Sequence, residues 1–118
     1  MGLALEPADV AKKAVEAALD KQAADILMVD IKQTSAVADY FVVCSAESDR
    51  QIRAICDEIE HSLKEAGVRR HHREGKEDSG WVLVDFGDVI VHVFSAPQRQ
   101  FYEIDKVWSE ATPVVRIM

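Results

Sequence analysis

The chain has 118 residues, of which 48% are hydrophobic and 30% are charged. This composition is typical of a folded globular protein, and every apolar run is far shorter than the ~20 residues that a membrane-spanning helix needs. The 14 Lys and Arg residues against 21 Asp and Glu residues give a net charge of −7. This balance argues against a general nucleic-acid binder, which needs a basic face, and favours a basic partner.

The N-terminus and the cysteines indicate the compartment. Residues 1–7 contain neither a basic region nor a long apolar run, so no secretory signal is expected and the cytoplasm is the default location. Cys44 and Cys56 are the two cysteines, and they lie in apolar-periodic segments rather than in a CxxC motif. We expect both to be small buried hydrophobic side chains.

The N-terminal part of the chain predicts a helix followed by two strands. Pro7 fits the first turn of a helix that runs to about Ala23. The apolar stripe of this helix consists of Val10, Ala14, Val15, Ala18 and Leu19. Residues 24–31 and 39–45 are nearly unbroken apolar runs, a pattern typical of strands that are covered on both faces.

A second helix is predicted over residues 49–66. Ser48 and Gln51 have the spacing of a capping box, and Gly67 supplies the C-terminal stop. The apolar residues recur at steps of three and four, which is the period of one helix face: Ile52, Ile55, Cys56, Ile59 and Leu63. The segment that follows, residues 69–78, is basic at first and acidic at its end, and it predicts an exposed loop.

Residues 81–86 and 89–94 predict a β-hairpin. A two-residue turn at Phe86 and Gly87 pairs valines on the core side, although a wider turn would change this register. The valine pairs are Val84 with Val89 and Val82 with Val91. The opposite face then carries large apolar groups and two carboxylates: Trp81, Leu83, Asp85, Asp88, Ile90, His92 and Phe94.

In this register Asp85 and Asp88 face one another. Like charges directly across a strand pair are destabilising, so a cation from elsewhere is expected to neutralise them. Residues 77–98 contain no Lys or Arg, and the candidate cation within the chain is Arg99. An apolar patch with a tryptophan and bordering carboxylates is typical of a docking surface for a basic protein. The alternative is that the third helix simply covers this face.

That third helix is predicted over residues 98–111, after Pro97 closes the strand region. Its inward positions would be Phe101, Ile104, Val107 and Trp108. Pro113 ends it and leaves a short tail. The alternation of helices and strands along the chain predicts an α/β fold.

Catalytic patterns are mostly absent. The histidines lack zinc-site spacing, no serine lies in a GxSxG motif, and the glycines form no phosphate-binding loop. Asp30, Asp85 and Asp88 could hold Mg²⁺ if they met at one edge of the sheet, so a metal-dependent nucleotidyltransferase-like enzyme is an alternative. The basic residues 69–73 could contact RNA phosphate, but the acidic residues nearby favour a solvated loop.

The most specific motif of the chain is the fourteen-residue run WVLVDFGDVIVHVF, from Trp81 to Phe94. It resembles the Iojap-like ribosomal silencing factor family (RsfS), and the resemblance extends from about Val10 to Ala111. The other matching segments are DYFVVCS at 39–45, SDRQ at 48–51, Glu74-Gly75, Arg99 and Phe101-Tyr102. The resemblance implies a single domain over residues 1–118, with its core over about residues 8–111.

The family resemblance implies a fold, a partner and an activity. The implied fold is a mixed β-sheet flanked by helices, similar to a nucleotidyltransferase core without its catalytic motif, so neither an enzyme nor a cofactor is expected. Family members bind the large ribosomal subunit through ribosomal protein L-fourteen, which blocks joining with the small subunit and represses translation. The N-terminus resembles that of the bacterial members rather than the organellar ones.

The family resemblance of the motif also implies a set of partner-binding residues. These are Trp81, Leu83, Asp85, Asp88, His92 and Tyr102, with Trp81 as the apolar anchor and the two aspartates as partners for Lys or Arg. The residues expected in the core without a role in binding are Phe41, Ile52, Ile55, Ile59, Val82, Val84, Val91 and Val93. Because small proteins tend to cover exposed aromatic patches, a homodimer is expected when no ribosome is present. Neither membrane binding nor sequence-specific nucleic-acid binding is expected.

Overall fold

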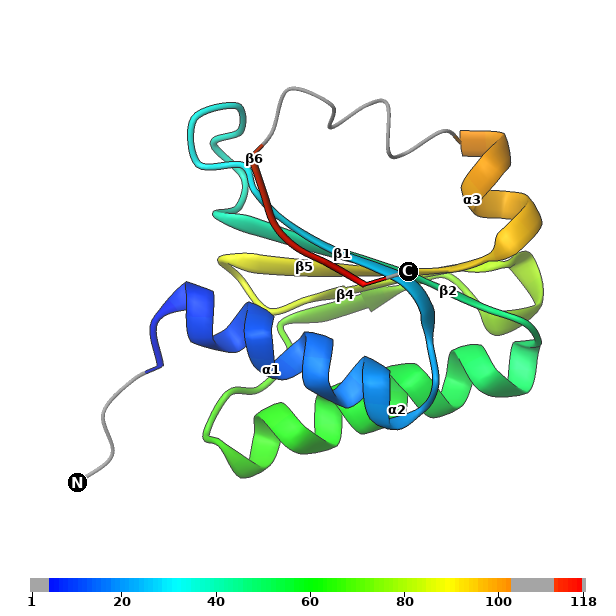
Figure 1. Cartoon of the computed structure of the whole chain (residues 1–118). Helices are drawn as coiled ribbons and strands as arrows, with labels where there is room; N and C mark the ends of the chain where they lie inside the picture. The colour runs from blue at the N-terminus through cyan, green and yellow to red at the C-terminus, as the bar shows by residue number, and fades with distance from the viewer. Residues whose placement is uncertain (1–4, 103–111, 118) are drawn as a thin grey trace.

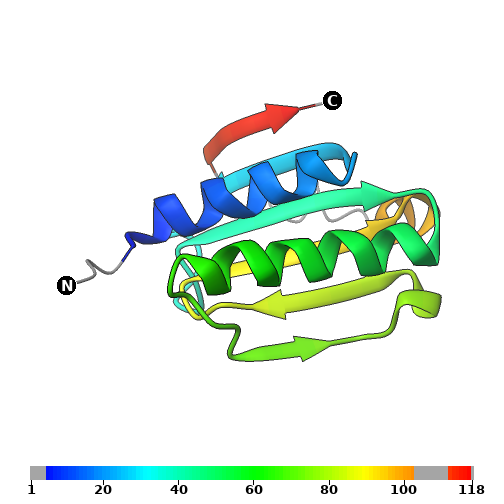
Figure 2. The ribbon, with the colours of Figure 1, turned by 90° about the horizontal axis from the view of Figure 1, so that it is seen from below.

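A computed structural model describes residues 5–102 and 112–117 of the chain. Its six strands are β1 (Ala24–Asp30), β2 (Tyr40–Ala46), β3 (His72–Glu74), β4 (Trp81–Asp85), β5 (Val89–Ser95) and β6 (Thr112–Ile117). They form one sheet in the order β3-β4-β5-β2-β1-β6, seen nearly edge-on in Figure 1 and strand by strand in Figure 2. Strands β2 and β5 are parallel and the other neighbours are antiparallel, which confirms the expected α/β fold with a mixed sheet.

Helices lie on both sides of this sheet. Helices α1 (Pro7–Asp20) and α2 (Asp49–Glu65) lie side by side on one face, as Figure 2 shows. Helix α3 (Ala96–Tyr102) lies on the other side, beyond the end of β5 (Figure 1). A 3₁₀ turn, η1 (Glu77–Ser79), precedes β4. Within the described residues, no helix is long and apolar enough to cross a membrane.

The start of α2 follows from its capping residues. The Ser48 hydroxyl accepts a hydrogen bond from the Gln51 backbone N–H at 3.0 Å, and the Gln51 side chain accepts one from the Glu47 N–H at 2.7 Å. The first bond satisfies a donor that the first helical turn leaves without a partner, and the second binds the residue before the cap to the same turn. The apolar face of α1 was predicted less well, because Leu19 is 42% exposed near the helix end.

The sheet separates two groups of buried side chains. The larger group lies between the sheet and α1 and α2, and it includes seven of the eight residues expected in the core: Ile52, Ile55, Ile59, Val82, Val84, Val91 and Val93. Phe41, the eighth, is buried in the group on the opposite face. Cys44 and Cys56 are free and buried, and burial raises the pKa of each thiol to about 12, which makes them inert at neutral pH.

The β4–β5 hairpin has a different turn from the predicted one. The Phe86 N–H donates to the Val89 carbonyl at 2.9 Å, so the two-residue loop consists of Gly87 and Asp88. Gly87 has φ +93°, which a glycine adopts readily, whereas Phe86 is buried against the helices. Val84 therefore pairs with Val91. Because this register differs from the predicted one by two residues, the strand side chains keep their predicted faces.

Two strands were missed by the sequence analysis. Residues 72–74 form β3 instead of part of a loop, and the expected C-terminal tail contains β6, which pairs with β1. The third helix begins at Ala96, and Pro97 lies in its first turn, where the missing N–H of proline is tolerated. Its predicted continuation through residues 103–111, with Ile104, Val107 and Trp108, lies outside the described residues.

Candidate docking surface

Four of the six expected partner-binding residues lie together on the sheet face opposite α1 and α2. Trp81 and Leu83 of β4 pair with Phe94 and His92 of β5, and Asp85 lies two residues further along β4. We call these five residues the Trp81 face. Trp81, Leu83 and Asp85 are half-buried, whereas His92 and Phe94 are buried. The face therefore presents a partly accessible apolar surface on a rigid two-strand support.

Aromatic contacts fix the indole of Trp81 on this face. Its ring stacks on Phe94 with 5.1 Å between centroids and 20° between planes. The indole Nε1–H donates to His92 Nδ1 at 3.2 Å. A tryptophan held by both a stacked ring and a hydrogen bond loses little conformational freedom on binding, so it is suited to anchor a partner.

His92 is a neutral imidazole in this arrangement. It is 4% exposed, and burial lowers the pKa of the ring to about 4. Because Nδ1 accepts the indole hydrogen bond, the ring proton lies on Nε2. That Nε2 atom is buried and has no hydrogen-bond partner among the described residues. His92 therefore acts as a support for Trp81 rather than as an exposed contact residue.

The two aspartates do not form the predicted pair. Asp85 pairs with Ile90 across the hairpin, and its Oδ1 accepts a hydrogen bond from the Gly87 N–H at 2.7 Å. Asp88 is exposed in the turn and lines an open pocket of about 500 Å³ with Phe86 and Val89, which belong to the helix-side core. The structure thus places Asp88 apart from the Trp81 face, and the predicted like-charge pair was wrong because the turn is shifted.

The remaining predicted residues lie elsewhere. Tyr102 ends α3, and its side chain lies outside the described part of the structure. Arg99, the expected neutralising cation, is buried and donates to Ser45 Oγ at 3.0 Å and to the Asp25 carbonyl. Arg99 therefore ties α3 to the β1–β2 side of the sheet and does not neutralise the hairpin carboxylates.

The alternative magnesium site does not assemble. Asp30 ends β1, which is separated from β4 by β2 and β5, a distance of about 14 Å at ordinary strand spacing. The Asp30 carboxylate instead binds Lys32 Nζ at 2.9 Å, and this hydrogen bond lowers the pKa of Asp30. Residues 5–102 and 112–117 contain no cluster of three or more His, Cys, Asp or Glu side chains suited to a metal ion.

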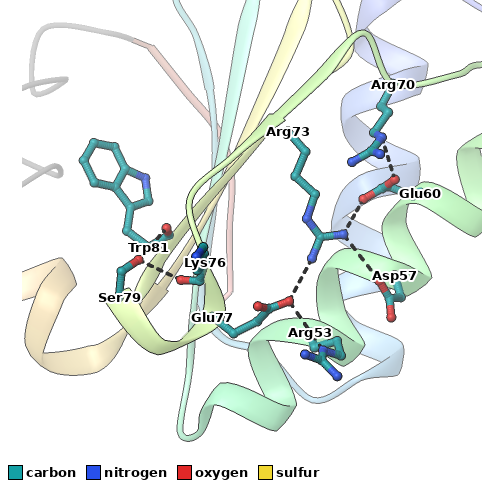
Figure 3. A network of polar contacts seen from close by, with 9 residues as sticks. All are labelled: Arg53, Asp57, Glu60, Arg70, Arg73, Lys76, Glu77, Ser79 and Trp81. Atoms are coloured by element: carbon teal, nitrogen blue, oxygen red, sulfur yellow. Dashed lines mark hydrogen bonds and ion pairs between the residues drawn. The ribbon is translucent and has the colours of Figure 1, made fainter.

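Two arginines of the basic segment 69–73 form ion pairs with carboxylates of α2, as Figure 3 shows. Arg73 contacts Glu60 at 2.8 Å, and Arg70 contacts the same carboxylate at 3.2 Å. These ion pairs reduce the charge available for RNA phosphate. These ion pairs were not predicted, although a basic segment following a helix with spaced carboxylates is a signal for such pairing.

A small pocket borders the Trp81 face. Its volume is about 240 Å³, and it is lined by Glu74, Gly75, Ser79, Trp81 and Leu83. Glu74 is exposed, so the pocket combines apolar walls with an accessible carboxylate at its rim. A lysine or arginine side chain matches both features, because its stem is apolar and its head is charged.

Comparison with known proteins identifies the family. The family model described as "Ribosomal silencing factor during starvation" matches residues 4–117, so the chain belongs to the ribosomal silencing factor family. A relative named ribosomal silencing factor RsfS, from Bacillus subtilis, is 44% identical over 86% of each chain. The chloroplastic protein Iojap of Zea mays is 30% identical over 84% of this chain and 43% of its own length.

A solved structure has the same fold. A crystal structure of a Chromobacterium violaceum protein superposes with a TM-score of 0.85 at 36% identity, covering 89% of this chain and 88% of that one. This likeness supports the sheet order described above. The family model and the named relatives confirm the family resemblance that the β4–β5 motif indicated.

Proposed function

We propose that this protein represses translation by binding the large ribosomal subunit through ribosomal protein L-fourteen and blocking joining with the small subunit. The observation that carries this proposal is the Trp81 face, which combines an anchored, half-buried indole with Leu83 and a carboxylate. Among the described residues, the ion pairs of Lys and Arg involve other carboxylates than Asp85. A basic ribosomal protein suits such a face, because cations on the partner can pair with Asp85 while Trp81 supplies apolar contact area.

The mechanism in this proposal requires no chemical reaction. Once the face is bound, the body of the protein occupies the volume that the small subunit needs, so steric exclusion accounts for the silencing. In this proposal the protein acts in the cytoplasm, is not an enzyme and uses no cofactor. The net charge of −7 should speed the encounter of this protein with a basic partner. The same charge should lower the affinity of this protein for ribosomal RNA.

We further propose that the free protein forms a homodimer through the Trp81 face. A two-fold dimer would bury the same apolar patch on both copies. Trp81 and Leu83 remain half-buried in the single chain, so each still has surface to bury. Sedimentation velocity tests this proposal: a monomer at high protein concentration would contradict it.

Co-sedimentation with separated ribosomal subunits tests the main proposal. The wild-type protein should pellet with large subunits and not with small ones. Trp81→Ala should pellet weakly, whereas Val37→Ala should behave like wild type, because Val37 is a 74% exposed apolar residue in the β1–β2 loop. Equal binding of the wild type to both subunits, or to neither, would contradict the proposal. A parallel pull-down with purified L-fourteen tests the partner.

A further inference from the structure

Arg73 links helix α2 to the turn that precedes Trp81. His72 and Glu74 pair with Asp85 and Leu83 of the Trp81 face, so the intervening Arg73 points to the other side of the sheet, toward α2. Its guanidinium lies 2.8 Å from Glu60, 3.4 Å from Asp57 and 3.2 Å from Glu77 (Figure 3). The side chains of Arg73, Glu60 and Glu77 are 19%, 22% and 22% exposed, so these pairs are shielded better than ordinary surface ion pairs.

The ion pair between Arg73 and Glu77 connects Arg73 to the turn, because Glu77 is part of that turn. Glu77 begins η1, and two bonds close that turn: the Ser79 N–H donates to the Lys76 carbonyl at 3.0 Å and the Gly80 N–H to the Glu77 carbonyl at 3.2 Å. The Ser79 hydroxyl also donates to the Lys76 carbonyl at 2.7 Å. The next residue after Gly80 is Trp81. The position of Glu77 therefore sets the direction in which the chain enters β4.

The turn also packs directly on the Trp81 backbone. A Cβ atom on Gly75 would lie 2.2 Å from the Trp81 carbonyl oxygen, so the two backbones are in contact without intervening side chains. The Ser79 hydroxyl lies 3.3 Å from the same carbonyl (Figure 3). A displacement of residues 75–80 would therefore move Trp81 and the pocket beside it.

We propose that Arg73 is a positioning residue for the docking surface: by binding Glu77 and the α2 carboxylates together, it holds the 75–80 turn and so the indole of Trp81. This inference rests on the proposed function, since the consequence it draws is for partner binding. Among the described cations in Figure 3, Arg53 reaches Glu77 and Arg70 reaches Glu60, but Arg73 reaches both carboxylates. Arg53 of α2 also reaches Glu77, at 3.4 Å, but its side chain is 68% exposed. Arg73 is thus the better shielded link between helix and turn, and it joins Glu60 to Glu77.

Hydrogen exchange tests the structural step. Arg73→Gln should speed exchange of the Ser79 and Gly80 amides, because their bonds close the turn that Arg73 holds. Arg70→Gln is the matched control, since it removes a cation from Glu60 and leaves the contact between Arg73 and Glu77 in place. Unchanged exchange in Arg73→Gln, or equal acceleration in both variants, would overturn the inference.

Binding to purified large subunits tests the functional step. Arg73→Gln should bind roughly tenfold more weakly, a coupling of the size seen within one ion-pair network, and Arg73→Lys should recover part of the loss. Ile59→Val, at a buried α2 position, controls for a general loss of stability. Arg73→Gln binding no more weakly than Ile59→Val would overturn the positioning role. If the wild type bound no subunit, the proposed function would fail, and the exchange measurement would still decide whether Arg73 holds the turn.

Discussion

Mild acid should destabilise the protein through His92. The unfolded chain takes up a proton on this imidazole near its ordinary pKa of 6.5, whereas burial lowers the pKa in the folded protein to about 4. Between these values the unfolded state binds more protons than the folded state. Stability from the neutral ring is therefore fully present above pH 6.5 and is lost as the pH falls toward 4. Protonation would also end the hydrogen bond from Trp81, because Nδ1 could no longer accept it.

The size of the effect follows from the two pKa values. The interval from 6.5 to about 4 corresponds to about 3 kcal/mol of unfolding free energy, at about 1.4 kcal/mol per pH unit. About 2 kcal/mol of this should already be lost at about pH 5. His92 is 4% exposed, so solvent screening reduces the figure little.

Urea unfolding of the wild type and of His92→Gln at about pH 7.5 and about pH 5 measures this effect. The carboxylates titrate in both proteins, so the difference between them isolates His92. We expect the wild type to lose about 2 kcal/mol more than His92→Gln on acidification. Identical pH dependence in wild type and His92→Gln would refute the assignment of a buried neutral imidazole.

Three further substitutions have defined outcomes. Gly75→Ala should lower the free energy of unfolding by about 2 kcal/mol or more, because Gly75 has φ +90° and a Cβ would collide with the Trp81 carbonyl; urea unfolding measures this, and an unchanged midpoint would contradict it. Ser48→Ala should cost about 1 kcal/mol through loss of the α2 cap, and Ser48→Asp should restore most of it; a melt insensitive to both changes would show that the cap contributes nothing. Trp81→Ala should weaken large-subunit binding at least about tenfold in sedimentation, and wild-type affinity would remove Trp81 as the anchor.

The central elements of the fold were predictable because their signals are local. Ser48 and the three- and four-residue spacing placed α2 within one residue of its observed end. The alternation along residues 81–94 assigned each strand side chain to its correct face. The register was not predictable from alternation, because a shift of two residues preserves the faces. The positive φ of Gly87 and the burial of Phe86 decide it.

The two edge strands were missed for different reasons. β6 pairs with β1, far away in the sequence, and β3 is short and polar. Dependence on residues that are distant in the sequence also limited the prediction of the candidate site. The motif placed Trp81 on the correct face, but the opposed carboxylates depended on the register, and the role of Arg73 depends on carboxylates from α2 and η1 that converge only in the folded chain.

Subunit joining is the most direct test of the proposed role. Separated large and small subunits are mixed at a magnesium concentration that joins them, with and without the protein, and the joined particles are quantified on a sucrose gradient. We expect the wild type to leave the large subunits largely unjoined and Trp81→Ala to have a much weaker effect. Full joining in the presence of wild-type protein that is bound to the large subunit would contradict steric exclusion as the basis of silencing.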